Sequence, residues 1–257
     1  MDMQKTTELV KPGVMRCFVS HQGGMPKIGD FVVVRHQVYG IQAFNFNASN
    51  NMRLENINVY CCPGMAIYAG DTTDILLDRF RVTFRPGEDR WMTATADATH
   101  FNYCRGMIIM QDCLFEGMGD DAANIHNMQF VLVEKVDNHT AKIAAGRKGW
   151  SIGGLRVGDK LEFCGGENRL APYATMVIES LSIAPDNQLA TVKFTDDIPA
   201  NATAGDVVGN SSALPAARIT NTIVRRNRAR GMLLQSRDII IDRCKYEDIS
   251  GAALHIT

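Results

Sequence analysis

Three aspartates are the residues of this 257-residue chain whose types and spacing best suit chemistry. Asp120 and Asp121 are consecutive and stand beside glycines, and Asp97 precedes Asp120 by 23 residues. Carboxylates that lie close together repel one another unless one of them holds a proton, so their pKa values move apart. Such a group offers an acid and a base at one pH, and hydrolysis of an acetal bond needs both.

Two other uses of the same aspartates stay open at this point. Carboxylate oxygens also bind calcium, and consecutive aspartates are common in solvated turns. The pair Asp196–Asp197 is interpreted as a turn of that kind. The pair Asp120–Asp121 differs because it stands where a strand-like run ends, near His126 and one repeat after Asp97.

Several polar or aromatic residues near the aspartates are candidate ligands of a substrate. His126 could tune or hydrogen-bond the carboxylates, and Arg230 could hold sugar hydroxyls or a carboxylate. Trp91 lies in the long loop before the first aspartate and could supply a stacking platform for a sugar ring. His100 and Asn102 follow the first aspartate closely enough to be ligands as well. For each of these residues a purely structural role stays open.

Five short segments of the chain share one pattern, which is an apolar core, a polar pair and a further apolar residue. They are residues 52–59, 74–82, 107–115, 222–227 and 239–246. Leu54 to Leu77 spans 23 residues and Val224 to Ile241 spans 17, which leaves no room for a helix between strands. Short strands at such a period, bounded by Gly, Asn or Asp, are typical of a parallel β-helix with coils about 4.8 Å apart. In such a stack we expect Asp97 and Asp120 on neighbouring coils.

Between residues 128 and 218 the rhythm changes to strictly alternating strands separated by turns that contain Gly-Asp or Asn. This pattern predicts a small antiparallel β-barrel inserted between two coils. The predicted fold class is therefore all-β, with β-helix coils over 14–127, the inserted barrel over 128–218 and resumed coils over 219–257. The last coil has no polar cap, so we expect either that the sequence is a fragment of a longer protein or that a partner replaces its missing ends.

The composition argues against several classes of function. The chain is 46% hydrophobic and 21% charged with a formal net charge of −1, which gives no reason to expect nucleic acid or an anionic membrane as partner. No apolar run is long enough to span a bilayer, and no secretory signal is visible. The seven cysteines match no zinc pattern and are expected to be buried free thiols. The basic run 225–230 is interpreted as a solvated face from which one or two arginines could reach a ligand.

The aspartates and the later segments resemble known families. One Asp followed a coil later by an Asp-Asp pair is similar to the inverting β-helix glycosidases, including polygalacturonases. The closer resemblance is to glycoside hydrolase family 110, the α-1,3-galactosidases that remove terminal galactose. It is carried by Asp97, by residues 120–126 (Asp-Asp-Ala-Ala-Asn-Ile-His), by the barrel insertion and by residues 227–236, and it spans roughly residues 14 to 257.

The resemblance implies an inverting, exo-acting glycoside hydrolase with a right-handed parallel β-helix of the pectin-lyase-like superfamily. By analogy with polygalacturonases, Asp120 protonates the leaving oxygen, while Asp97 and Asp121 activate a water, with acid and base about 6.5–9.5 Å apart. The resemblance also implies a galactose-terminated glycan as substrate and export to the periplasm or the medium. No metal or organic cofactor is expected, since acid–base hydrolysis with water needs none. Asn124 and Gln235 enter the predicted site through the matching segments. The expected substrate-binding residues are Trp91, His100, Asn102, Asn124, His126, Arg230 and Gln235.

Two alternative functions stay open. A polygalacturonase-like hydrolase or a uronate lyase predicts a basic groove around the aspartates, whereas the sequence near them contains little lysine. A non-catalytic sugar-binding or structural β-helix predicts that Asp97, Asp120 and Asp121 do not converge on one cleft. The sequence gives no indication of the oligomeric state.

Overall fold

The computed structural model describes residues 7–17, 27–29, 33, 35, 37–147, 150–165 and 171–257. Parts of the segment predicted as the first coils, 14–127, lie outside the described residues. The chain forms two units, Met1–Val34 and Arg35–Thr257. In the first unit, β1 (Thr7–Lys11) pairs antiparallel with β2 (Val14–Cys17).

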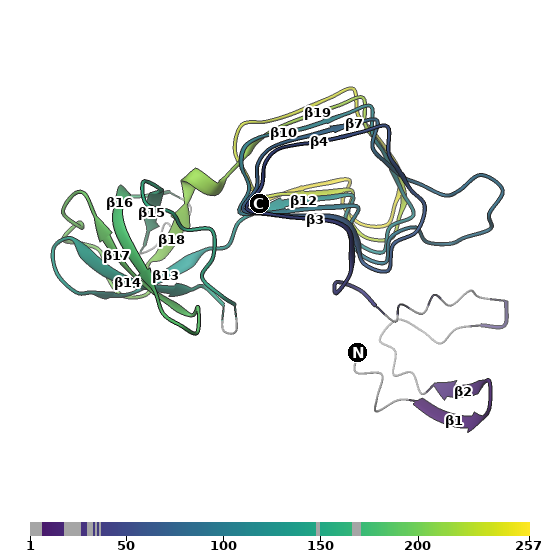
Figure 1. The fold of residues 1–257 in the computed structure, drawn as a ribbon, viewed down its shortest axis with the longest axis horizontal. Helices are drawn as coiled ribbons and strands as arrows, with labels where there is room; N and C mark the ends of the chain where they lie inside the picture. The colour runs from purple at the N-terminus through teal and green to yellow at the C-terminus, as the bar shows by residue number, and fades with distance from the viewer. Residues whose placement is uncertain are drawn as a thin grey trace. The chain divides into compact units, whose positions relative to one another are not determined.

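The second unit contains three parallel sheets through which the chain passes in turn (Figure 1). The first sheet has the order β3 (Gln42–Asn47), β6 (Met65–Gly70), β9 (Thr99–Asn102), β12 (Ala123–His126), β21 (Met232–Leu234) and β24 (Leu254–Ile256). The second has β4 (Asn50–Glu55), β7 (Thr73–Asp78), β10 (Arg105–Gln111), β19 (Ala216–Thr220) and β22 (Ile239–Asp242). The third has β5 (Asn58–Val59), β8 (Arg81–Val82), β11 (Leu114–Glu116), β20 (Ile223–Asn227) and β23 (Lys245–Ile249). The five repeats of the sequence fall on strands of the second and third sheets.

The corner between the second and third sheets repeats one backbone conformation. Its residue has a positive φ of 49–55° at Asn56, Arg79, Asp112, Asn221 and Arg243. Asn and Asp adopt this left-handed conformation more readily than other non-glycine residues. The corner side chains also bond from coil to coil, since Arg79 Nε donates to Asn56 Oδ1 at 2.6 Å and Arg243 Nε donates to Asn221 Oδ1 at 3.0 Å. These bonds help to keep successive coils in register.

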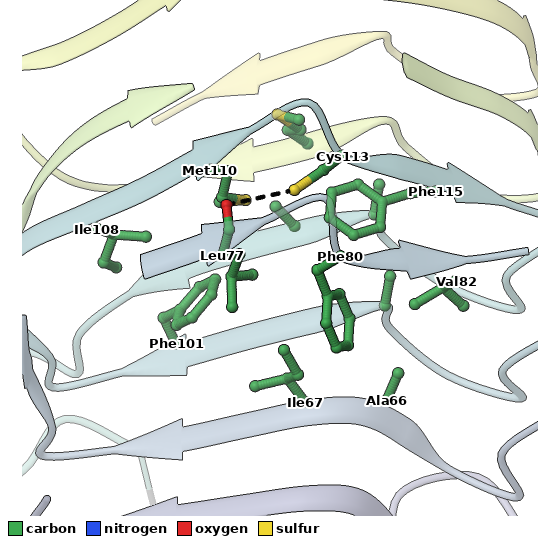
Figure 2. Close-up of a cluster of buried hydrophobic side chains, with 14 of the residues drawn as sticks. Ala66, Ile67, Leu77, Phe80, Val82, Phe101, Ile108, Met110, Cys113 and Phe115 are labelled. Carbon is green, nitrogen blue, oxygen red and sulfur yellow. Dashed lines mark hydrogen bonds between the residues drawn. The ribbon is translucent and has the colours of Figure 1, made fainter. Parts of the chain in front are cut away.

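Apolar side chains from successive coils form one buried cluster inside the three sheets (Figure 2). The largest fully buried members include Ile67, Leu77, Phe80, Phe101, Ile108, Met110 and Phe115. Burial of one such side chain stabilises a protein by about 1.5–3 kcal/mol, so stacking of coils is the main source of stability here. Cys113 is a buried free thiol, as expected, and its Sγ donates to the Leu77 carbonyl at 3.6 Å, whereas Cys61 is exposed.

Between β12 and β19 the chain forms a closed six-stranded antiparallel barrel (Figure 1). Its strands follow the order β13 (Phe130–Lys135), β14 (Thr140–Ala145), β17 (Leu189–Phe194), β16 (Ala174–Ile183), β15 (Lys160–Cys164) and β18 (Val207–Asn210). The barrel has its own core, which includes Phe130, Phe163 and Phe194. After the barrel, β19 pairs in parallel with β10, so the two ends of the barrel segment return to adjacent coils. Among the described residues, no helix has the length and apolar character needed to cross a membrane.

A buried arginine joins the barrel to the parallel sheets. Arg105, at the start of β10, is 9% exposed and donates to both carboxylate oxygens of Asp159, at 2.6 and 2.9 Å. Asn210 Nδ2 donates to the same carboxylate at 2.8 Å, and Arg105 Nε donates to Asp71 at 3.3 Å. Removing one partner of a buried ion pair leaves the other charge uncompensated, which is strongly unfavourable. The contact between barrel and sheets therefore depends on this pair.

We predict that Arg105→Ala lowers the free energy of unfolding by about 3–5 kcal/mol, because Asp159 would stay buried without its cation. The matched control is Arg156→Ala. Arg156 pairs with Asp71 at 2.8 Å, but its side chain is 42% exposed, so we expect a loss below about 1 kcal/mol. Urea unfolding at neutral pH measures both values. Losses of equal, small size would contradict a stabilising role for the Arg105 pair.

Candidate active site

The parallel pairing of β9 with β12 brings the three aspartates together. Thr99 lies opposite Ala123, so Asp97 is level with Asp121 and not with Asp120. The Asp121 amide donates to Asp97 Oδ1 at 3.1 Å. One carboxylate oxygen from each aspartate lies within 4.8 Å of the other two. The three residues thus converge, which the non-catalytic alternative does not predict.

Asp97 is almost completely buried, with 2% of its surface exposed. His100 Nδ1 lies 2.6 Å from Asp97 Oδ2, and the amide of Asp121 bonds the other oxygen. Burial raises the pKa of the Asp97 carboxyl, and the hydrogen bond with His100 opposes this rise. The carboxylate of Asp97 is therefore held in position through both of its oxygens, by His100 and by the Asp121 amide.

Asp121 is completely buried and forms a bidentate pair with Arg230. Arg230 Nε and Nη2 donate to the two Asp121 oxygens, both at 2.9 Å. Burial raises the pKa of Asp121, the hydrogen bonds from Arg230 oppose the rise, and the charge of Asp97 adds to it. The structure thus places Arg230 at the predicted site, with its guanidinium bound to an aspartate.

Asp120 is the most accessible of the three aspartates. The Tyr39 hydroxyl donates to Asp120 Oδ2 at 2.7 Å. Burial, and then this hydrogen bond, raise the pKa of Tyr39 to about 12, so the hydroxyl keeps its proton at neutral pH. The Asp120 main chain is also held, because Asn227 Nδ2 donates to its carbonyl at 2.9 Å.

The two histidines predicted at the site face each other on neighbouring strands. His100 on β9 and His126 on β12 have their Nε2 atoms 2.9 Å apart. The Tyr68 ring stacks on His100, with centroids 5.7 Å apart and planes inclined by 25°. These rings extend the site from Asp97 along the outer face of the first sheet.

The remaining predicted ligands lie on the same sheet or in a loop. Asn102 and Asn124 each have a buried Oδ1 with no hydrogen-bond partner among the described residues, so each could accept from a hydroxyl. Gln235 and His126 line a cavity of about 720 Å³ together with barrel residues and with Ser236, Arg237 and Thr257. Trp91 lies between β8 and β9 and is 60% exposed.

Three residues at the site were not predicted. Tyr39 and Arg35 precede all the coils that carry the aspartates, and no local pattern in the sequence distinguishes them. Arg35 Nη1 and Arg228 Nε both approach the carbonyl of Gly119, at 3.5 and 2.8 Å. Arg228 belongs to the basic run 225–230, and that run was the signal that could have identified it. A Cβ at Gly119 would collide with a main-chain carbonyl of the preceding coil, so this position needs glycine.

The three carboxylates are close enough to hold a cation, but their oxygens already have other partners. Both oxygens of Asp121 accept from Arg230, and both oxygens of Asp97 contact His100 or an amide. Calcium needs six to eight oxygen ligands, and a guanidinium at 2.9 Å competes with it. The geometry fits hydrogen-bonded acid–base carboxylates better than a cation site.

Fold and site together define an all-β protein in which stacked parallel strands bring three carboxylates together. No family model matches the chain. The chain is 30% identical over 230 residues to alpha-1,3-galactosidase B of Akkermansia muciniphila, covering 89% of this chain and 29% of that protein. It is 27% identical over 250 residues to alpha-1,3-galactosidase A of Bacteroides fragilis, covering 96% and 41%. It is 31% identical over 220 residues to alpha-1,3-galactosidase B of Parabacteroides distasonis, covering 79% and 35%.

The chain is thus a relative of the α-1,3-galactosidases, as its resemblance to that family predicted. The similarity extends over most of the chain, from the coils before the aspartates to the coils after the barrel. The chain spans less than half the length of the curated relatives it matches.

We predict that Asp97→Asn makes the protein more stable at pH 7. Because burial raises the pKa of Asp97, the folded protein holds this proton to higher pH than the unfolded chain. The stability from this group is therefore fully present below the unfolded pKa, about 3.9, and is lost as pH rises through the folded pKa. Urea unfolding measures the free energy of unfolding of the variant and the parent at both pH values. The variant should exceed the parent at pH 7, and this excess should be smaller at pH 4. Asp196→Asn, in an exposed turn, is the control, and a less stable Asp97→Asn at pH 7 would contradict the prediction.

Proposed function

We propose that this chain carries the active site of a glycoside hydrolase that removes terminal α-1,3-linked galactose from glycans. The observation that carries the proposal is the convergence of Asp97, Asp120 and Asp121, with one oxygen of each within 4.8 Å of the others. Similarity to proteins named alpha-1,3-galactosidase supports the choice of substrate.

We propose further that the fold is a right-handed parallel β-helix over 14–127 and 219–257, with the barrel of 128–218 as an insertion. Two observations support this organisation. Each parallel sheet takes one strand from each coil, and β19 pairs with β10 on the far side of the barrel. An insertion whose ends lie close together can leave the host stack intact.

In the proposed mechanism Asp120 protonates the leaving oxygen, while Asp97 and Asp121 activate the attacking water. The accessibility of Asp120 supports its role, because the acid must reach the glycosidic oxygen. Asp97 and Asp121 are buried, but each accepts hydrogen bonds from a neighbouring side chain. The hydrogen bonds from His100 to Asp97 and from Arg230 to Asp121 favour the ionised form of each carboxyl. A base must be ionised to accept a proton from water.

The proposed substrate contacts lie beside this cluster. The unpartnered Oδ1 atoms of Asn102 and Asn124 accept from sugar hydroxyls, and Gln235 contacts the glycan from the wall of the cavity. The exposed ring of Trp91 provides an apolar surface for a sugar face. Arg230 reaches the substrate only through the edge of its guanidinium that Asp121 does not occupy.

Inversion is the proposed stereochemical course, and retention is its specific competitor. Inverting enzymes keep their two carboxyl groups about 6.5–9.5 Å apart, and retaining enzymes keep them about 5–5.5 Å apart. The nearest oxygens here lie within 4.8 Å, and a nearest-oxygen distance is a lower bound on the separation of two carboxyl groups. The family resemblance and the presence of two buried carboxylates that can share one water support inversion.

An anionic sugar is the second candidate substrate, and two arginines favour it. Arg35 and Arg228 both donate to main-chain carbonyls beside the aspartates. Within the described part of the chain neither guanidinium forms an ion pair with a carboxylate. Their charges could therefore contact the carboxylate of a uronic acid.

The proposed reaction needs no metal or organic cofactor, because water is the nucleophile and carboxyl groups move the protons. By resemblance to the family we also propose export to the periplasm or the medium. Fractionation of the source cells tests this, and a strictly cytoplasmic protein would contradict it.

We predict that incubation with Galα1-3Gal releases β-galactose as the first product. Proton NMR of the fresh reaction mixture distinguishes the two anomers before mutarotation. α-Galactose as first product would establish retention and overturn the proposed course. Faster hydrolysis of an α-galacturonide than of the galactoside would favour the anionic candidate instead.

We predict that Asp120→Asn and Asp97→Asn each lower kcat on Galα1-3Gal by roughly 10²–10⁴-fold, the usual contribution of general acid–base catalysis. The two variants should differ on an aryl galactoside, whose leaving group needs little protonation. Asp120→Asn should recover much of its rate there, while Asp97→Asn should not. Asp196→Asn is the matched control, since Asp196 belongs to the exposed Asp-Asp pair of the barrel. Recovery by Asp97→Asn in place of Asp120→Asn would reverse the two roles.

A further inference from the structure

Two imidazole rings form a hydrogen-bonded chain behind Asp97. His100 Nδ1 lies 2.6 Å from Asp97 Oδ2, and His100 Nε2 lies 2.9 Å from His126 Nε2. His126 Nδ1 in turn lies 3.4 Å from the carbonyl oxygen of Asn127. All four ring nitrogens therefore have a partner within the protein, and the two rings meet nearly edge to face, at 88°.

The outer end of the chain determines where His126 carries its hydrogen. The Asn127 carbonyl can only accept, so it favours a hydrogen on His126 Nδ1. A neutral His126 with its hydrogen on Nδ1 has a lone pair on Nε2. The 2.9 Å contact between the two Nε2 atoms then needs a hydrogen on His100 Nε2, which donates to His126.

The inner end of the chain determines the other nitrogen of His100. An ionised Asp97 only accepts, so His100 Nδ1 must donate to it. His100 then carries hydrogens on both ring nitrogens and is an imidazolium between a carboxylate and a neutral imidazole. Burial, and then repulsion from His100, lower the pKa of His126 to about 4, which agrees with a neutral His126 at pH 7.

The groups around the two rings are compatible with a positive charge on His100. From β6 the Tyr68 ring stacks on His100. The charge of Asp120 repels the charge of Asp97, the carboxylate that contacts the His100 ring. On the outer side, Glu162 and Arg237 line the cavity beside His126, but they pair with each other at 2.6 Å and add little net charge.

Arg147 also lines the cavity beside His126, and its guanidinium lies over the Trp150 ring, 5.1 Å from the centroid. Near Asp97, Asp121 forms a bidentate pair with Arg230, which is close to neutral as a unit. The positive charge of His100 is thus balanced by Asp97, its only carboxylate partner among the described residues.

We propose that His126 is a positioning residue that acts on Asp97 through His100. By accepting from His100 Nε2, neutral His126 holds the imidazolium ring so that Nδ1 points at Asp97 and keeps that carboxylate ionised and oriented towards the water. This inference rests on the proposed function of Asp97 as part of the base. It replaces the expectation that His100 and His126 bind the substrate, because neither ring has a nitrogen left for a sugar hydroxyl.

Nitrogen NMR of the protein labelled with 15N-histidine tests the proton arrangement without any enzyme assay. At pH 7, His100 should show two protonated nitrogens and His126 one, on Nδ1. His139, which is half-exposed and lies 3.2 Å from Asp197, is the internal reference for an imidazole outside this hydrogen-bonded chain. A neutral His100 at pH 7 would overturn the proposal, whether or not the protein hydrolyses galactosides.

Two substitutions of His126 separate positioning from bulk packing. Gln offers an amide oxygen that can accept from His100 Nε2, whereas Phe fills the space and accepts nothing. In His126→Phe the hydrogen on His100 Nε2 loses its acceptor, so its proton NMR resonance at pH 7 should move upfield and the hydrogen should exchange faster with water. His126→Gln should keep the parent resonance. If Phe and Gln leave this resonance equally unchanged, His126 does not act on His100.

Kinetics complete the test on the same variants. We expect His126→Phe to lower kcat on Galα1-3Gal by the order of 10²-fold, the effect of misplacing a reacting group by about 1 Å, with KM nearly unchanged. His126→Gln should recover most of kcat. A raised KM with unchanged kcat would instead identify the histidines as substrate ligands and refute the proposal. If His126→Phe does not fold, as judged by its urea unfolding curve, the Gln variant and the spectrum of the parent still decide.

Discussion

The pairing of β9 with β12 is the constraint on which the candidate site depends. Parallel strands lie at a fixed spacing of about 4.8 Å, so Thr99 opposite Ala123 forces the side chains of Asp97 and Asp121 together. Burial is the main reason why the pKa of both carboxyls is raised, and repulsion adds to the rise, from Asp120 at Asp97 and from Asp97 at Asp121. The apolar layers that stack inside the coils stabilise the register strongly enough to hold the carboxylates in this unfavourable arrangement.

Each carboxylate is compensated by a group from a different part of the chain. Arg230 reaches Asp121 from the coil after the barrel, and Tyr39 reaches Asp120 from before the first described coil. His100, the partner of Asp97, stands three residues after it on β9, and its other ring nitrogen contacts His126 on the next coil. The site is therefore complete only when coils on both sides of the barrel are folded. The site can form around the barrel because β19 pairs with β10 after it, which returns the chain to the adjacent coil.

The repeat, the alternating segment and the Asp-Asp pair were all recognisable in the sequence because each is a local pattern. Apolar residues at a short period report which side chains are buried, and strict alternation reports a barrel strand. These patterns located the strands of the second and third sheets and the position of the barrel. They also identified Asp97, Asp120 and Asp121 as the residues that converge, since one repeat separates them.

The tertiary structure alone decided register and partners. Coils differ in length, from 22 residues between the paired Ile219 and Ile241 to 33 between the paired Leu77 and Met110. Val224 and Ile241, which sequence spacing treated as one repeat apart, lie in different sheets, because Val224 pairs with Tyr246. Sequence spacing likewise predicted Asp97 beside Asp120, while the strand pairing places it beside Asp121. Arg35 and Tyr39 could not be recognised, because their contacts span 60 and 81 residues and no local pattern marks them. Two residues bond across coils only if every coil between them has the length that brings them side by side. The folded structure shows these lengths through the strand register, and the sequence does not.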